Sequence, residues 1–153
     1  ASGICRNLEL EAAGVKVGLA VDGSASNDGS NLITEARQAL LLQKLKYGAD
    51  RVTHLDALRW ATAGSAAILG RNDIGKLEVG SVADLALFKL DELAFAGSHD
   101  PLAALLLCQT HRADHVMVAG DWKVQDEQLI GVDLDRLISN QHKLAKTLAR
   151  TAS

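Results

Sequence analysis

An aspartate and the polar loop after it are the residues in this chain best placed to do chemistry. The short apolar run 18–21 ends at Asp22, and small or polar residues follow as far as Ser30. Small and hydroxyl-bearing residues allow a backbone to approach a ligand closely and to hydrogen-bond to it. The loop residues that could line a site are Gly23, Ser24, Ser26 and Asn27. The same residues also suit a simple turn in which Asp22 caps the next helix, and the residues alone favour this interpretation.

The loop also places oxygen atoms at alternate positions, as a calcium-binding loop does. Position twelve counted from Asp22 is Ile33, where an EF-hand has a bidentate glutamate, so an EF-hand is not expected. No Gly-Lys-Ser/Thr sequence follows, and GxGxxG is missing, so the loop is not a P-loop or a dinucleotide fingerprint. A phosphate cradle at the N-terminus of a helix over 32–46 stays as a second hypothesis.

Two histidines, His111 and His115, are spaced so that a helix could present both imidazoles to one metal. The segment lacks the glutamate of an HExxH motif and leads directly into a predicted strand, so we do not expect a metal pair there. No serine lies in a GxSxG motif. Cys5 and Cys108 are far apart and form no CxxC, which favours two reduced thiols over a disulfide.

Helices and one strand are expected to position Asp22. Residues 7–14 predict a short helix that a glycine stops, and residues 15–21 predict a strand. The apolar run is too short for a helix and suits a parallel strand that is buried on both faces. Asp22 would then lie at the C-terminal end of this strand, where α/β folds collect their catalytic groups. Beyond the loop, apolar residues at helical spacing predict a helix over 32–46, on which Glu35 is expected to be solvated.

Capping signals mark the starts of two later helices. Thr53-His-Leu-Asp56 has the form of a capping box, and the helical pattern continues through small residues to position 69. Asp100 and Pro101 suit the cap and the first turn of a helix that continues to position 108.

Strand patterns and a last helix fill the second half of the chain. Residues 85–88 predict a strand, and residues 116–119 and 122–125 predict a hairpin that turns at Gly120-Asp121. Apolar residues at helical spacing predict a helix over 134–148, whose basic residues are expected on a solvated face.

Composition limits the class of protein. The 153 residues, 48% of them apolar, suffice for one ordinary domain with a core. A net charge of −3 and only 3% aromatic residues give no signal for nucleic-acid binding. No apolar run approaches the roughly 20 residues that span a bilayer, and the N-terminus lacks the basic and apolar regions of a signal peptide. We therefore expect a cytoplasmic protein with no nucleic-acid or membrane partner.

Several segments together resemble one enzyme family. Residues 17–28, Val-Gly-Leu-Ala-Val-Asp-Gly-Ser-Ala-Ser-Asn-Asp, closely resemble the last barrel strand and the following loop of amidohydrolase-superfamily deaminases, and Glu35-Ala-Arg-Gln38 extends the match. Residues 61–70 and 74–88 resemble the segment by which these enzymes leave the barrel and enter a small β domain. Residues 116–121 resemble its closing hairpin. Within the superfamily the chain is most similar to 8-oxoguanine deaminases, in the group that holds guanine and cytosine deaminases and triazine hydrolases.

The resemblance implies an α/β fold class. The chain would be the C-terminal part of a TIM-like (β/α)8 barrel, with its last strand and the following helices, plus part of a small β-sandwich domain. Residues 1–72 would form the end of the barrel, residues 73–130 part of the β-sandwich domain with an inserted helix, and residues 131–153 a C-terminal helix.

The resemblance also implies a chemistry for Asp22. Enzymes of this superfamily bind a divalent metal, usually zinc and alternatively iron, and the aspartate that matches Asp22 approaches the metal and handles the proton of the attacking water. Such a reaction would deaminate a purine-like heterocycle, 8-oxoguanine or guanine, and release ammonia. The full enzyme is expected to be a homo-oligomer.

The chain lacks several of the metal-binding and catalytic residues that this superfamily uses. It contains no HxH motif and no counterpart of the family's proton-shuttling glutamate, whereas a catalytic zinc normally needs three protein ligands and an open position. We therefore expect a C-terminal part that begins just before the last barrel strand, is inactive alone, and depends on metal ligands from a missing N-terminal portion of the barrel. An unpaired strand edge and bare apolar helix faces favour association with that portion or with further copies. The rival hypothesis is a non-catalytic module that uses residues 23–30 for anion binding or assembly.

Overall fold

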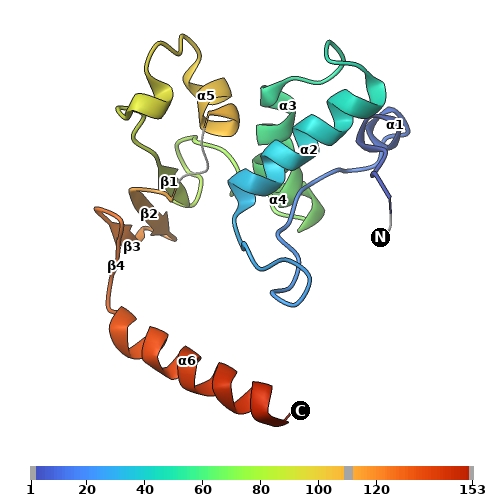
Figure 1. Cartoon of the computed structure of the whole chain (residues 1–153). Helices are drawn as coiled ribbons and strands as arrows, with labels where there is room; N and C mark the ends of the chain where they lie inside the picture. Colours follow the sequence, from blue (N-terminus) through green and yellow to red (C-terminus); the bar gives the residue numbers. More distant parts are fainter. Residues whose placement is uncertain (1–2, 109–111, 152–153) are drawn as a thin grey trace.

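The computed structural model describes residues 3–108 and 112–151 (Figure 1). Short helices occupy the N-terminal half, a small antiparallel sheet follows, and a long helix ends the chain. The short helices gather on one side of the molecule and the sheet lies on another. None of the helices within these two ranges is long and apolar enough to cross a membrane.

Four of the predicted helices are present in the N-terminal half. They are α1 (Asn7–Ala12), α2 (Leu32–Tyr47), α3 (His54–Arg59) and α4 (Ser65–Ile68). A π-helical turn, Trp60–Gly64, joins α3 to α4 without a loop. The sequence predicted a continuous helical path here, but it did not predict the π-helical turn within it.

Side-chain caps fix where these helices begin. The Asn31 side-chain oxygen accepts hydrogen bonds from the backbone N–H groups of Ile33 and Thr34, at 2.9 and 3.2 Å, and so starts α2. Thr53 and Asp56 form both halves of the predicted capping box at the start of α3. Each cap satisfies backbone donors that a helix leaves free at its first turn.

The core lies where α2 meets α3, the π-helical turn and α5 (Pro101–Leu107). Its buried members are Ala36, Leu40, Val52, Ala57, Trp60 and Leu106. As predicted, Asp100 caps α5, because its carboxylate accepts from the N–H groups of Leu102 and Ala103. A short 3-10 turn, Leu93–Phe95, precedes this helix.

The sheet is an antiparallel meander in the order β1-β2-β3-β4. Its strands are β1 (Leu85–Leu87), β2 (His115–Val118), β3 (Asp121–Gln125) and β4 (Gln128–Leu129). The first three confirm the predicted strand and hairpin, whereas β4 has too few residues to give a sequence signal.

The hairpin turns one residue earlier than predicted. Val118 pairs with Asp121, so the two turn residues are Ala119 and Gly120 rather than Gly120-Asp121. Both have positive φ, 52° and 87°, as a tight hairpin turn with the twist of the strands requires. The Asp84 carboxylate accepts from the Ala119 N–H at 2.8 Å and holds the unfavourable backbone of Ala119 in place.

Residues 15–21 are not a strand, contrary to the sequence prediction. A strand is stabilised by hydrogen bonds to a neighbouring strand, and the only sheet in residues 3–108 and 112–151 is the meander β1-β2-β3-β4. The segment instead runs beside the π-helical turn, where the Leu19 N–H donates to the Trp60 carbonyl at 3.1 Å.

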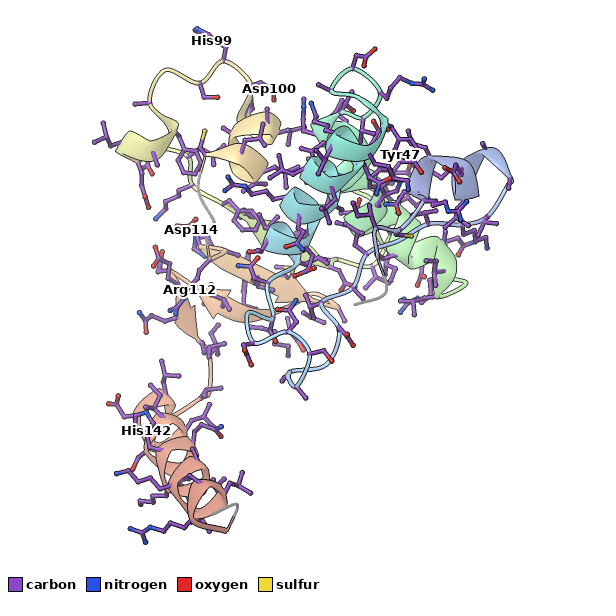
Figure 2. All side chains as sticks on the ribbon, turned by 45° about the vertical axis from the view of Figure 1, so that its right-hand side comes forward. Tyr47, His99, Asp100, Arg112, Asp114 and His142 are labelled. Atoms are coloured by element: carbon purple, nitrogen blue, oxygen red, sulfur yellow. The ribbon has the colours of Figure 1, made fainter. Side chains whose placement is uncertain are left out.

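The last helix, α6 (Leu134–Thr151), extends away from the rest of the molecule (Figure 1). Its apolar side chains recur at helical spacing, as predicted, yet they are exposed. Leu144 and Leu148 have 61% and 69% of their surface accessible. Figure 2 shows the same separation from a second direction, with His142 on α6 marking the helix. The apolar side chains of α6 are therefore largely accessible to solvent within the described residues.

Candidate functional site

Asp22 lies at the surface, where the segment after α1 becomes the polar loop. Its carboxylate oxygen Oδ1 accepts from the Gly23 N–H at 2.7 Å. Its backbone has φ of 63°, in the left-handed region that few residues other than glycine, asparagine and aspartate enter. Such backbone strain in a non-glycine residue tends to occur at functional positions.

The loop after Asp22 is a turn held by its own backbone. The N–H groups of Ser26 and Asn27 both donate to the Gly23 carbonyl, at 2.8 and 2.9 Å. The Asn27 side-chain oxygen accepts from the Gly29 N–H at 3.0 Å. Ser24 and Ser26 are exposed, so their hydroxyl groups face solvent and are accessible to a ligand. The turn that the sequence offered as an alternative is thus present, but Asn31 rather than Asp22 caps the next helix, α2.

One loop residue is tied to α2 by a contact that the sequence did not indicate. The Asn27 amide nitrogen donates to the Glu35 carboxylate at 2.6 Å, in a partly buried position. Glu35 was expected to be solvated, and the structure corrects that expectation. An acidic residue in the first turn of a helix is also typical of compensation of the helix dipole, so the sequence could not separate the two roles.

Hydrogen bonds from the π-helical turn fix the segment that leads to Asp22. The Ser65 hydroxyl oxygen lies 3.1 Å from the Leu19 nitrogen, 2.8 Å from the Leu19 oxygen and 2.9 Å from the Trp60 oxygen. The segment is therefore held at its backbone, three residues before Asp22.

A charged cluster holds the π-helical turn against α1. The Arg59 guanidinium donates two hydrogen bonds to the Glu11 carboxylate, at 2.7 and 3.2 Å, and Trp60 Nε1 donates to the same group at 2.9 Å. The hydrogen bond from Arg59 has the largest effect and, with that from Trp60, holds the pKa of Glu11 below its usual value of 4.5. The same pairing raises the pKa of Arg59. The cluster is a support for Trp60 rather than part of the accessible site.

A second link of this kind joins α1 to α2. The Tyr47 hydroxyl donates to the Glu9 carboxylate at 3.0 Å, and Figure 2 shows Tyr47 beside α1. This hydrogen bond lowers the pKa of Glu9, and desolvation, followed by the same hydrogen bond, raises the pKa of Tyr47. Together the two clusters fix α1 on the helices that carry the loop.

Asp22 is the one predicted metal ligand, and its accessible carboxylate suits that chemistry. Among residues 3–108 and 112–151, no group of three or more histidine, cysteine, aspartate or glutamate side chains could hold a metal ion. A catalytic zinc normally takes three protein ligands. Asp22 therefore fits as one donor of a set that the described residues do not complete.

Only one of the two histidines spaced for a metal pair belongs to the described part of the chain. His111 lies outside the described residues, and His115 is part of the hairpin. Its Nδ1 accepts from the Asp126 N–H at 3.3 Å, and its ring meets that of Trp122 edge to face at 5.8 Å between centroids. His115 therefore has a structural role in the sheet.

The second hypothesis placed a phosphate-binding site at the N-terminus of α2, where a side chain of the protein already binds the backbone N–H groups. The Asn31 side chain already occupies the N–H groups of Ile33 and Thr34, which an anion at this helix N-terminus would need. This arrangement weighs against the anion-binding hypothesis.

A wide apolar cleft of about 1460 Å³ separates the helices from the sheet. Side chains of α2, the π-helical turn and the three longer strands line it, and the start of α6 closes one end. Arg112 and Glu127 are among its few charged lining residues, and Figure 2 shows Arg112 near the sheet. Asp22 does not line this cleft, so the cleft and the candidate metal ligand are separate features.

Comparison with known proteins places the chain in a family. Residues 1–123 match the amidohydrolase family. An 8-oxoguanine deaminase from Pseudomonas aeruginosa is 64% identical over 148 residues, which are 97% of this chain and 33% of that protein.

Solved structures agree with the sequence match. An atrazine chlorohydrolase from Arthrobacter aurescens, complexed with zinc, superposes with a TM-score of 0.86 at 38% identity, over 93% of this chain and 32% of that one. An adenosine deaminase from Xanthomonas campestris with bound zinc gives a TM-score of 0.90 at 32% identity, over 97% and 35%. The chain thus spans about a third of the length of these relatives.

Proposed function

Because the chain belongs to the amidohydrolase family, we propose that it is the C-terminal part of a metal-dependent aminohydrolase. The observation that carries the proposal is the 64% identity to an 8-oxoguanine deaminase over 97% of the chain. The proposed reaction is hydrolytic deamination of a purine-like heterocycle, 8-oxoguanine or guanine, with release of ammonia. The adenosine deaminase among the structural relatives supports a purine-like substrate.

In this proposal Asp22 is a metal ligand and the group that handles the proton. When bound, a divalent metal would supply a water of lowered pKa. The Asp22 carboxylate would accept a proton from the attacking water and would pass it to the departing ammonia. Its exposure and its position before an accessible polar loop support this role. Gly23, Ser24, Ser26 and Asn27 are the proposed lining of the substrate side.

Zinc is the proposed metal, and iron is the alternative. The two zinc-containing relatives support this choice. Since the described residues supply a single donor, the remaining ligands would come from an N-terminal portion of the barrel. The segment 15–21, which belongs to no sheet among the described residues, and the exposed apolar side chains of α6 support that portion as a partner.

The proposed domain boundaries follow the same division. Residues 1–72 end the barrel, residues 73–130 contribute to a small β-sandwich domain with an inserted helix, and residues 131–153 form a C-terminal helix. The sheet, which begins at Leu85, supports the first boundary, and the inserted helix α5 adds Leu106 to the core of the preceding helices.

Ammonia release tests the proposal. The full-length protein that carries this chain, loaded with zinc, is expected to release ammonia from 8-oxoguanine or guanine and to stop when a chelator removes the metal. This chain alone, with zinc added, is expected to release none. Zinc-dependent activity of this chain alone contradicts the proposed division of ligands, and a full-length protein that is inactive on both purines contradicts the proposed substrate.

A further inference from the structure

The segment that carries Asp22 is held by one hydroxyl group. Ser65 Oγ accepts from the Leu19 N–H at 3.1 Å and donates towards the carbonyl oxygens of Leu19 and Trp60, at 2.8 and 2.9 Å. The Leu19 N–H also donates to the Trp60 carbonyl at 3.1 Å. A single side chain therefore bonds to both backbone polar groups of Leu19.

Two glycines allow this close approach of backbones. A Cβ on Gly18 would lie 2.8 Å from the backbone nitrogen and Cα of Ser65, and a Cβ on Gly64 would meet the Val17 carbonyl oxygen. Real Cβ atoms do not come so close to backbone atoms, so any larger residue at either position would push the segment away from the helix. The close packing therefore depends on a glycine on each side of the contact, Gly18 in the segment and Gly64 next to Ser65.

The π-helical turn supplies a fixed acceptor for the segment. Trp60 is fully buried, and its ring nitrogen donates to Glu11, so its backbone has little freedom. Its carbonyl accepts from outside its own helix, at the point where the helix widens to π geometry. Insertions of this kind within α-helices are frequently found at functional sites.

Asp22 stands between two anchors. The Ser65 contact holds the chain three residues before it, and the Asn27–Glu35 hydrogen bond holds it five residues after. Three residues span at most about 11 Å of chain, so a shift at Leu19 is transmitted to Asp22. The Asp22 carboxylate accepts a hydrogen bond from the adjacent Gly23 N–H, which fixes nothing beyond the loop.

We infer that Ser65 is a positioning residue for Asp22: its hydroxyl fixes Leu19 against the π-helical turn and thereby sets where the Asp22 carboxylate meets the metal. The inference rests on the proposed function, because it assigns Ser65 a task in the same site. Residues that orient a metal ligand from behind typically contribute about 10- to 100-fold to metal affinity or activity.

The test uses Ser65→Ala in the full-length protein that carries this chain. The zinc dissociation constant, measured by competition with a chelator, is expected to rise about 10- to 100-fold. The value of kcat is expected to fall by a similar factor while KM changes less than about twofold, because the substrate-lining loop is untouched. Ser98→Ala is the matched control, since it removes an exposed hydroxyl that bonds only to the Asp100 carbonyl, and it is expected to change neither quantity.

A second variant keeps the test decisive if Ser65→Ala does not fold. Gly18→Ala leaves the serine in place and displaces the segment from the other side, so it is expected to weaken zinc binding in the same way. Melting of the metal-free proteins reports folding. Either variant with native metal-free melting and native zinc affinity overturns the inference.

Asp22→Asn, measured alongside, separates this inference from the proposed function. Loss of zinc affinity in Asp22→Asn, with Ser65→Ala and Gly18→Ala indistinguishable from Ser98→Ala, overturns the positioning role and leaves the proposed function intact. Unchanged zinc affinity and kcat in Asp22→Asn overturns the role of Asp22 and this inference with it.

Discussion

Asp22 combines an exposed carboxylate with a left-handed backbone that only a few residue types tolerate. A structural turn would be served better by glycine at this φ. An aspartate is therefore best explained by the use of its carboxylate, and the proposed use is to bind the metal and transfer the proton.

The first prediction concerns that carboxylate. Asp22→Asn in the full-length protein keeps the size and the backbone preference of the residue but removes the negative charge and the proton acceptor. We expect kcat for ammonia release to fall about 10²- to 10⁴-fold, the usual contribution of general acid–base catalysis. Asp28→Asn removes the same charge from an exposed position in the same loop and is expected to keep kcat. Equal activity in the two variants contradicts the role of Asp22.

The second prediction concerns the hydrogen bond between Asn27 and Glu35. Because each side chain satisfies the other at 2.6 Å, the effects of Asn27→Ala and Glu35→Ala on the free energy of unfolding should not add. Residues in direct contact show coupling energies of roughly 0.5–3 kcal/mol. Urea unfolding of the two single variants and the double variant measures the coupling. Additive effects would show that the contact does not hold the loop.

Sequence reasoning recovered the residues whose partners are local. The caps by Thr53 and Asp100 depend on backbone groups two or three residues away, so the pattern alone predicts them. Glu35 and Ser65 form hydrogen bonds with groups 8 and 46 residues away, and no sequence spacing predicts such contacts. The sequence therefore located Asp22 but not what holds it.

Helices and turns, which depend on neighbouring residues, were predicted more accurately than the strand, which depends on a distant partner. The helices formed as predicted, and the hairpin formed with its turn one residue earlier than predicted, since each depends on its own caps, turns and periodicity. The strand over 15–21 did not form, because its pattern needs a neighbouring strand that residues 3–108 and 112–151 do not provide beside it.

The third prediction concerns the start of α3. Thr53→Ala removes the hydroxyl that accepts from the Asp56 N–H and leaves that donor without its cap. We expect the free energy of unfolding to fall by about 1 kcal/mol, the typical cost of losing a threonine cap. Thr53→Ser keeps the hydroxyl and should stay close to the original stability. Urea unfolding compares the three proteins, and equal losses in both variants would exclude the cap as the cause.

The fourth prediction concerns pH and the contact of α1 with the π-helical turn. The hydrogen bond from Arg59 lowers the pKa of Glu11 in the folded protein, so the folded state favours the ionised carboxylate. The stability that this carboxylate contributes is present above its ordinary pKa of 4.5 and is lost as the pH falls through the lower folded value. Glu11→Gln should therefore be less stable than the original protein at pH 7, and the difference should shrink below pH 4.5.

Urea unfolding at a series of pH values measures this difference. Tyr47→Phe removes the hydrogen bond that lowers the pKa of the neighbouring Glu9, so it is a second case in which the stability difference should shrink as the pH falls. A gap between the original protein and Glu11→Gln that stays constant from neutral to acidic pH would contradict the assignment of the pKa shift.

The whole molecule exposes more surface than its mass requires. Its accessible area is 10810 Å², whereas a compact monomer of 16.2 kDa exposes about 7,500 Å². Large apolar side chains contribute to the difference, among them those of α6 and Leu45 on α2. Large exposed apolar surface is typical of protein contact sites, so it is consistent with the proposed N-terminal partner.

The fifth prediction tests the central claim, that the Asp22 carboxylate is a ligand of a catalytic metal completed by residues outside this chain. The measurement is anomalous X-ray diffraction at the zinc edge from crystals of the zinc-loaded full-length protein. We expect a zinc peak with an Asp22 carboxylate oxygen at about 2.0–2.2 Å and the other protein ligands from the N-terminal portion. A fully ligated zinc ion in the barrel with Asp22 beyond bonding distance would contradict the claim.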